Sequence, residues 1–188
     1  MTSQNNTPIK GPIGFKAGGV KAGLKKSGAL DLAALLSDRP AVSAGVTTTN
    51  LFCSAPVRIC RQRLENSPMA RGVIVNAGIA NACTGDQGMA DAEEMTSLAE
   101  KASGVDKGDF LVASTGVIGH ELPMDKLREV TPGLFETLSE EGWEDFARAI
   151  MTTDTVPKIS CRKVKMGGLL GKSHEITILG ISKGAGMI

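Results

Sequence analysis

The chain has 188 residues, enough for one domain or two small ones, and 41% of them are hydrophobic, so it can bury a core. Its net charge of +1, from 21 basic and 20 acidic residues, lacks the basic excess typical of a nucleic-acid-binding protein. No apolar run approaches the roughly 18 residues of a membrane-spanning helix, and no basic-then-apolar leader is visible. We therefore expect neither nucleic acid nor a membrane as a partner.

The first quarter of the chain is predicted to be largely extended. Residues 1–8 are polar and are expected to fray. The glycine-rich stretch 14–25 lacks the G-x-G-x-x-G spacing of a dinucleotide loop, so we predict an extended segment with close backbone contacts. Residues 30–37 and 41–48 are predicted to form two strands, separated by the turn-rich tripeptide Asp38-Arg39-Pro40.

The middle of the chain predicts a strand–helix–strand unit that follows a short helix over residues 55–64. Residues 72–76 and 110–113 are predicted to be the strands, and residues 87–102 the helix between them. One face of this helix carries apolar residues at helical spacing, namely Ala92, Met95, Ala99 and Ala102. The arginines of the preceding helix are predicted to form a solvated face, namely Arg58, Arg61 and Arg63.

The last third is predicted to contain two helices followed by two strands. One helix begins at Pro123, and a second begins near Glu141. The second helix carries an apolar stripe that is typical of a core, namely Trp143, Phe146, Ala147, Ile150 and Met151. Residues 160–166 are predicted to be a half-exposed strand and residues 175–182 an apolar strand, with a turn over residues 167–173.

The cysteines and histidines give no pattern of a metal site. No two cysteines form a C-x-x-C pair, and two histidines are too few for a histidine-based cluster. We therefore expect no metal ion, and we predict reduced, buried thiols in a cytoplasmic protein. The cysteines are Cys53, Cys60, Cys83 and Cys161.

Two polar clusters are candidates for chemistry. Ser114-Thr115-Gly116 follows a predicted strand, and its hydroxyls and open backbone can donate hydrogen bonds to a developing oxyanion. A glycine-containing turn with local hydrogen bonds is the alternative. Residues 152–155, Thr-Thr-Asp-Thr, place three hydroxyls and a carboxylate at a predicted helix end, where a capping cluster is the alternative.

Six ordered motifs span nearly the whole chain. They are Gly14-Phe15 with Gly23-Leu24-Lys25, Thr48-Thr49-Asn50 with Ala55-Pro56-Val57, Asn76-Ala77-Gly78 with residues 80–85, residues 114–119 with Pro123-Met124, residues 149–155 with Pro157-Lys158, and residues 183–188. Together they resemble the ornithine acetyltransferase family, the bifunctional glutamate N-acetyltransferases of arginine biosynthesis.

The resemblance implies that residues 1–188 form the single domain of an α chain, cut from a self-cleaving precursor. Family members are cut a few residues after a Lys-Gly-x-Gly-Met motif, which here places the cut beyond Ile188. The threonine that follows the cut begins the β chain and is the nucleophile, so no threonine of this chain is nominated for that role. An α2β2 heterotetramer is also implied.

The implied reaction moves an acetyl group from N2-acetylornithine to glutamate by ping-pong chemistry, through an acetyl-threonine on the β chain. It needs no metal or organic cofactor, and some members also use acetyl-CoA as donor. The implied oxyanion-stabilising pair is Thr115 and Gly116. The implied substrate-binding residues are Lys183 and one of Thr152 and Thr153, of which we favour Thr152.

Two positions depart from the family pattern. Thr47 stands where phenylalanine usually precedes Thr-Thr-Asn, and Ile79 stands where a second asparagine is usual. Because Ile79 lies near a candidate site, a relative with an altered acyl donor or acceptor in a secondary pathway is one alternative. A related self-cleaving aminopeptidase that hydrolyses amides is another, and a complete, non-enzymatic binding module is a third.

The order of elements predicts an α/β or α+β chain, because helices and strands interleave. The resemblance implies more, namely a DmpA/ArgJ-like fold in which layered β-sheets pack against helices. That arrangement resembles the N-terminal-nucleophile hydrolases in its layering.

Overall fold

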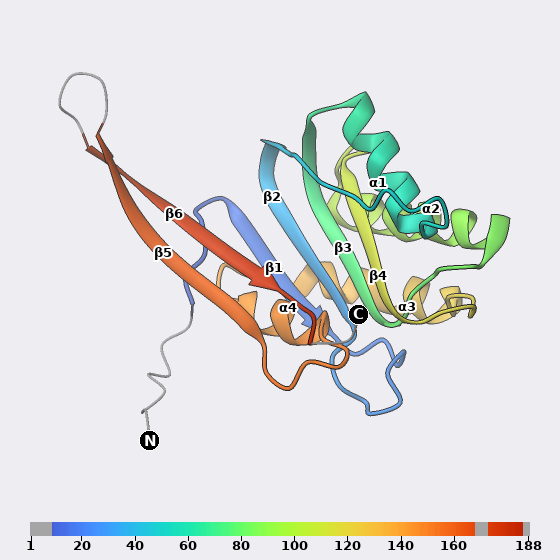
Figure 1. Ribbon diagram of the computed structural model, residues 1–188. Coiled ribbons are helices and arrows are strands. Elements are labelled where there is room, and N and C mark those ends of the chain that lie inside the picture. The colour runs from blue at the N-terminus through green and yellow to red at the C-terminus, as the bar shows by residue number, and fades with distance from the viewer. Residues whose placement is uncertain (1–8, 168–172, 186–188) are drawn as a thin grey trace.

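A computed structural model of the chain describes residues 9–167 and 173–185 (Figure 1). The predictions for residues 1–8, for the centre of the turn over 167–173 and for the last three residues of the C-terminal motif lie outside this range. Residues 14–25 contain the first strand, which confirms the prediction of an extended segment.

A four-stranded sheet forms the centre of the fold, in the order β1-β2-β3-β4. Its strands are β1 (Phe15–Val20), β2 (Leu32–Val42), β3 (Met69–Ile79) and β4 (Phe110–Val117). The first three strands are antiparallel neighbours, whereas β3 and β4 run parallel. The parallel pair requires a crossover, and the predicted strand–helix–strand unit supplies it.

Four helices cover the two faces of this sheet (Figure 1). They are α1 (Ala55–Asn66), α2 (Gly85–Ser103), α3 (Met124–Thr137) and α4 (Trp143–Ala149). Side chains alternate between the faces of a strand, so the two faces of the sheet belong to two separate core clusters. One cluster joins the sheet to α1, α2 and α3, and the other joins it to α4.

The remaining strands form a separate antiparallel ribbon. They are β5 (Lys158–Gly167) and β6 (Ser173–Ser182), and the ladder runs from the pair Lys158 and Ser182 to the pair Gly167 and Ser173. One end of the ribbon packs on the α4 side of the sheet, and Figure 1 shows the other end extending beyond it. The fold is therefore a mixed α+β arrangement in layers, as predicted.

The outer edge of β4 is covered by side chains of α1. The Cys60 thiol donates to the Val112 carbonyl over 3.0 Å and accepts from the Val112 amide over 3.3 Å. Arg63 donates to the Phe110 carbonyl and, over 2.8 Å, to the Glu100 carboxylate. These contacts satisfy backbone groups that an edge strand otherwise leaves unpaired.

The prediction of two strands around Asp38-Arg39-Pro40 is wrong. The structure has one strand, β2, with a shift of register between Leu36 and Ala41, and residues 43–48 lie outside any strand. The pairing with β1 ends at Ser37, so Pro40 sits where no β1 carbonyl loses a donor to the missing N–H. A proline in such an irregular stretch is tolerated, whereas the sequence alone suggested a turn.

Two further predictions need correction. Arg63 is not part of a solvated face, because its side chain is 15% exposed and reaches inward to Glu100.

The cysteines are free thiols as predicted, but Cys83 is exposed and the other three are half-buried. Cys83 has a positive φ of 57° in the tight loop before α2, and this loop turns its side chain outward. The apolar stripe of α4 is buried as predicted, apart from the half-buried Met151.

Candidate functional site

The largest cleft in the described part of the chain has a volume of about 940 Å³ and lies at the ends of β3 and β4. Five segments far apart in sequence line it. They are the loop after β1, the end of β3, the end of β4 with the residues that follow it, the segment after α4, and the segment after β6. The sequence-predicted site residues all line this cleft, namely Thr115, Gly116, Thr152, Thr153 and Lys183.

Gly116 lies directly against the backbone of β3. It pairs in register with Gly78, and a Cβ at Gly116 would lie 2.2 Å from the Gly78 carbonyl carbon. Its φ of +137° is also one that other residues rarely adopt. The backbone that approaches Gly116 is therefore that of the neighbouring strand.

Lys183 joins three of these segments. Its ammonium Nζ donates a hydrogen bond to Thr115 Oγ1 over 2.6 Å and another to Thr152 Oγ1 over 2.8 Å. Thr153 lines the same cleft but is not a partner in either bond. Burial lowers the pKa of Lys183, the Asp154 carboxylate opposes this effect, and the Lys158 ammonium adds to it.

Asp154 connects the segment after α4 to the end of the ribbon. Its side chain is 1% exposed, and its Oδ1 accepts from the Gly184 amide over 2.7 Å and from the Lys158 ammonium. The Lys158 ammonium also donates to the Gly184 carbonyl over 2.6 Å. The hydrogen bond from Lys158, with those from the Gly184 and Thr152 amides, lowers the pKa of Asp154 to about 2.

Lys25 also lines the cleft, although the sequence predicted no functional role for its side chain. Its Nζ donates to the carbonyls of Leu30 over 2.6 Å and Ala149 over 3.0 Å. Burial lowers the pKa of Lys25, Asp31 opposes this, and Lys183 lowers it further. The only sequence signal was its place in the motif Gly23-Leu24-Lys25, which gave no role for the side chain.

The two departures from the family pattern lie in different places. Ile79 lines the cleft with Gly78. Thr47 is exposed, lines a different hollow, and accepts a hydrogen bond from Arg61 over 3.1 Å. Of the two departures, Ile79 is therefore the one that changes the wall of the cleft.

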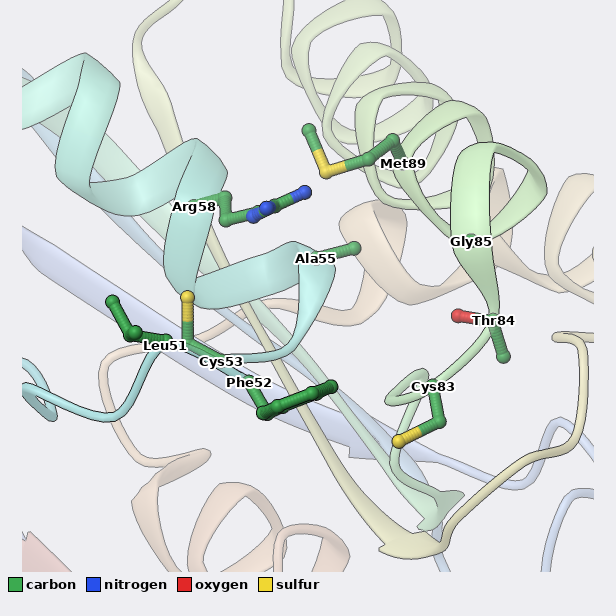
Figure 2. A pocket seen from close by; sticks show the side chains of 9 residues that line it. All are labelled: Leu51, Phe52, Cys53, Ala55, Arg58, Cys83, Thr84, Gly85 and Met89. Carbon is green, nitrogen blue, oxygen red and sulfur yellow. The ribbon is translucent and has the colours of Figure 1, made fainter.

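A smaller hollow of about 240 Å³ lies between the starts of α1 and α2. Figure 2 shows the Phe52 ring and the Cys83 thiol on facing sides of it, with Arg58 beside Met89. Arg58 is the one charged side chain among its nine lining residues, so the lining holds no carboxylate or histidine to act as an acid or base for either cysteine. We therefore centre the site on the larger cleft.

Within residues 9–167 and 173–185, no three potential metal-ligating side chains come together. No helix in this part of the chain is both long and apolar enough to cross a membrane.

Comparison with known proteins identifies the family. A family model described as the ArgJ family matches residues 16–188. The chain belongs to the ArgJ family. The predicted resemblance to the ornithine acetyltransferases is thereby confirmed.

Proteins of similar sequence are named arginine biosynthesis bifunctional protein ArgJ. The protein from Nitratidesulfovibrio vulgaris is 47% identical over 177 residues, which cover 94% of this chain and 44% of the relative. The protein from Geobacter sulfurreducens is 48% identical over 175 residues, which cover 93% of this chain and 43% of the relative. The chain thus spans less than half the length of these ArgJ relatives.

Two crystal structures are similar to this chain over most of its length. The arginine biosynthesis bifunctional protein ArgJ from Bacillus halodurans is 36% identical with a TM-score of 0.86, and the match covers 97% of this chain and 92% of that one. The ornithine acetyltransferase from Mycobacterium tuberculosis, solved in complex with ornithine, is 38% identical with a TM-score of 0.82. That match covers 96% of this chain and 93% of the other.

Proposed function

We propose that the protein of which this chain is a part transfers an acetyl group from N2-acetylornithine to glutamate. In this proposal it acts in arginine biosynthesis, in the cytoplasm. The products are ornithine and N-acetylglutamate. Membership of the ArgJ family and the names of the relatives support the reaction class. The observation that carries the proposal is the Lys183 ammonium, held between the Thr115 and Thr152 hydroxyls in the largest cleft.

The nucleophile in this proposal is the N-terminal threonine of a second polypeptide. Its hydroxyl attacks the acetyl carbonyl carbon while its own α-amine, with a reference pKa of about 8, takes the proton. The tetrahedral intermediate then collapses, the C–N bond breaks, and the α-ammonium returns the proton to the departing amine of ornithine. The glutamate amine attacks the resulting acetyl ester, and release of N-acetylglutamate regenerates the threonine hydroxyl.

The role of this chain in the proposal is to stabilise the negative charge of the tetrahedral intermediate. Thr115 Oγ1 accepts a hydrogen bond from Lys183, so the Thr115 hydroxyl proton is free to be donated elsewhere. In the proposal it donates to the oxyanion of the tetrahedral intermediate, together with the Gly116 amide. The reaction uses no metal or organic cofactor, because amino-acid groups supply both the nucleophile and the donors.

Lys183 is proposed to hold a carboxylate of the substrate. Its ammonium is a compact charge whose two hydrogen bonds to hydroxyls leave its third proton for a ligand. Thr152 is the better candidate for the substrate-binding threonine, since it is the one that Lys183 contacts. Thr153 remains the alternative on the same wall of the cleft.

The assembly in this proposal is an α2β2 heterotetramer of two self-cleaved precursors. Residues 1–188 are its α chain, a single domain that a β chain completes. Acetyl-CoA is a second acetyl donor that the proposal allows.

One observation favours a second candidate function, which is transfer with an altered donor or acceptor. Ile79 replaces a polar side chain of the family pattern and lines the cleft. An apolar wall at this point favours a less polar ligand group than an asparagine does.

The test is an assay of the full-length purified protein with acetyl-labelled N2-acetylornithine. The proposal predicts label in N-acetylglutamate when glutamate is present. Label in free acetate, with glutamate making no difference, would instead support the aminopeptidase-like alternative. Label accepted by other amino acids in preference to glutamate would support the altered specificity, and no release of label at all would support a binding module.

A further inference from the structure

Lys183 lies just outside the regular structure that could hold it. The ladder between β5 and β6 ends at the pair Lys158 and Ser182, and Lys183 is the next residue. Its long side chain must reach from there to the Thr115 and Thr152 hydroxyls. The position of its ammonium therefore depends on how the backbone at Lys183 and Gly184 is fixed.

The Asp154 carboxylate fixes this backbone from the opposite segment. Its Oδ1 accepts from the Gly184 amide over 2.7 Å and from the Lys158 ammonium, which in turn donates to the Gly184 carbonyl over 2.6 Å. Its Oδ2 accepts from the Thr152 amide over 3.4 Å. One nearly inaccessible carboxylate thus ties the segment that carries Thr152 to the residue that follows Lys183.

The structure assigns Asp154 as a positioning residue, whose carboxylate holds the Lys183 ammonium between Thr115 and Thr152. This inference rests on the proposed function of the same cleft. Asp154 itself does not line the cleft, so it acts through Lys183 and not through contact with a substrate.

Charge supports the same arrangement. Asp154 raises the pKa of Lys183 and Lys158 lowers it, and the ammonium groups of Lys25 and Lys183 oppose each other. Lys26, His120 and Glu121 also line the cleft. Loss of the Asp154 charge therefore favours a neutral Lys183 and lowers its pKa, whereas loss of the Lys158 charge raises it. The pKa of Asp154 is itself depressed from 3.8 to about 2, so its stabilising contacts are complete above about pH 4 and are lost as the pH falls toward 2.

The test compares Asp154→Asn and Lys158→Met in the full-length protein, with Asp145→Asn as the matched control on the exposed surface of α4. Displacement of a positioned group typically costs up to about 100-fold in rate, and we expect kcat/KM to fall on that scale in Asp154→Asn. The alkaline limb of the pH profile should move to lower pH in Asp154→Asn and to higher pH in Lys158→Met. Asp145→Asn should match the wild-type protein.

These outcomes separate the inference from the function on which it rests. If wild-type protein transfers acetyl groups but neither variant alters kcat/KM or the pH profile, Asp154 is a loop anchor only and the inference is wrong. If wild-type protein transfers none, the proposed function fails, and an NMR titration of the Lys183 side chain still tests the charge coupling. Should Asp154→Asn not fold, kcat/KM in Lys158→Met decides, because that variant removes the ammonium that joins the Asp154 carboxylate to the Gly184 carbonyl. An unchanged kcat/KM there refutes the positioning role.

Discussion

The sheet of β1–β4 and the ribbon of β5 and β6 differ in how much of their apolar side chains is buried. In the sheet, both faces carry buried side chains, since Ile74 and Phe110 on one face and Ala33 on the other are completely inaccessible. In the ribbon, the apolar side chains far from Lys183 remain between 41% and 57% exposed, namely Val164, Met166, Ile176 and Ile178. Those at the Lys183 end are half-buried against the α4 side of the sheet, namely Ile159, Leu179 and Ile181. The sheet that carries Thr115 is therefore packed on both faces, whereas the end of β6 packs on one face only and polar contacts add to its support at Lys183.

The candidate site lies where these two regions meet. Thr115 comes from the sheet and Lys183 follows the ribbon at the end where it packs on the sheet, and a 2.6 Å hydrogen bond joins them. Variants in the sheet region should therefore change stability, variants at the junction should change turnover, and variants in the ribbon away from the junction should change little.

The largest expected effect is on stability, from Arg63→Met in the sheet region. Arg63 pairs with Glu100, and their side chains are 15% and 6% exposed. The substitution leaves the Glu100 charge buried without its partner, which typically costs about 3–5 kcal/mol. Denaturant unfolding of the full-length protein measures this loss. A change below about 1 kcal/mol would show that the pair does not support the packed region.

The next effect is on turnover, from Thr115→Ala at the junction. Loss of an oxyanion-stabilising donor typically lowers kcat by about 100- to 1,000-fold. Because one hydroxyl is lost from a half-buried position, the unfolding transition should stay close to that of the wild type. Steady-state acetyl transfer measures the effect, with Thr137→Ala at the exposed end of α3 as control. Full activity in Thr115→Ala would remove Thr115 from the proposed mechanism.

The smallest effect is expected from Lys163→Ala in the ribbon. Lys163 pairs across the strands with Glu175 over 2.7 Å, and both side chains are about half exposed, at 64% and 48%. Exposed ion pairs of this kind contribute about 0.2–1 kcal/mol and weaken in salt. Unfolding at low and high salt measures this contribution. A loss as large as that of Arg63→Met would contradict the contrast between the two regions.

Much of the packed region could be predicted from local pattern. The strand–helix–strand unit of β3, α2 and β4 and the apolar stripe of α4 follow from hydrophobic spacing, which reports burial directly. The single strand β2 could not be predicted, because Asp38-Arg39-Pro40 has turn composition. Whether such a tripeptide turns the chain or bulges a strand depends on neighbours that are distant in sequence.

The candidate site was predictable in part, and for a different reason. Thr115, Thr152 and Lys183 were named from the family motifs, and the structure brings the three together. The contacts of Asp154 with Gly184 and Lys158 were not foreseen. Asp154 and Gly184 are 30 residues apart. Nothing in their local composition shows whether Asp154 bonds a distant backbone amide or caps the helix that precedes it.

The central claim is that this chain supplies the charge-holding side of an acetyl-transfer site whose nucleophile lies on a second polypeptide. The most direct test is mass spectrometry of full-length protein incubated with N2-acetylornithine but without glutamate. We predict two polypeptides, with one acetyl group on the N-terminal threonine of the second. A single uncut polypeptide, or an acetyl group found only on this chain, would contradict the claim.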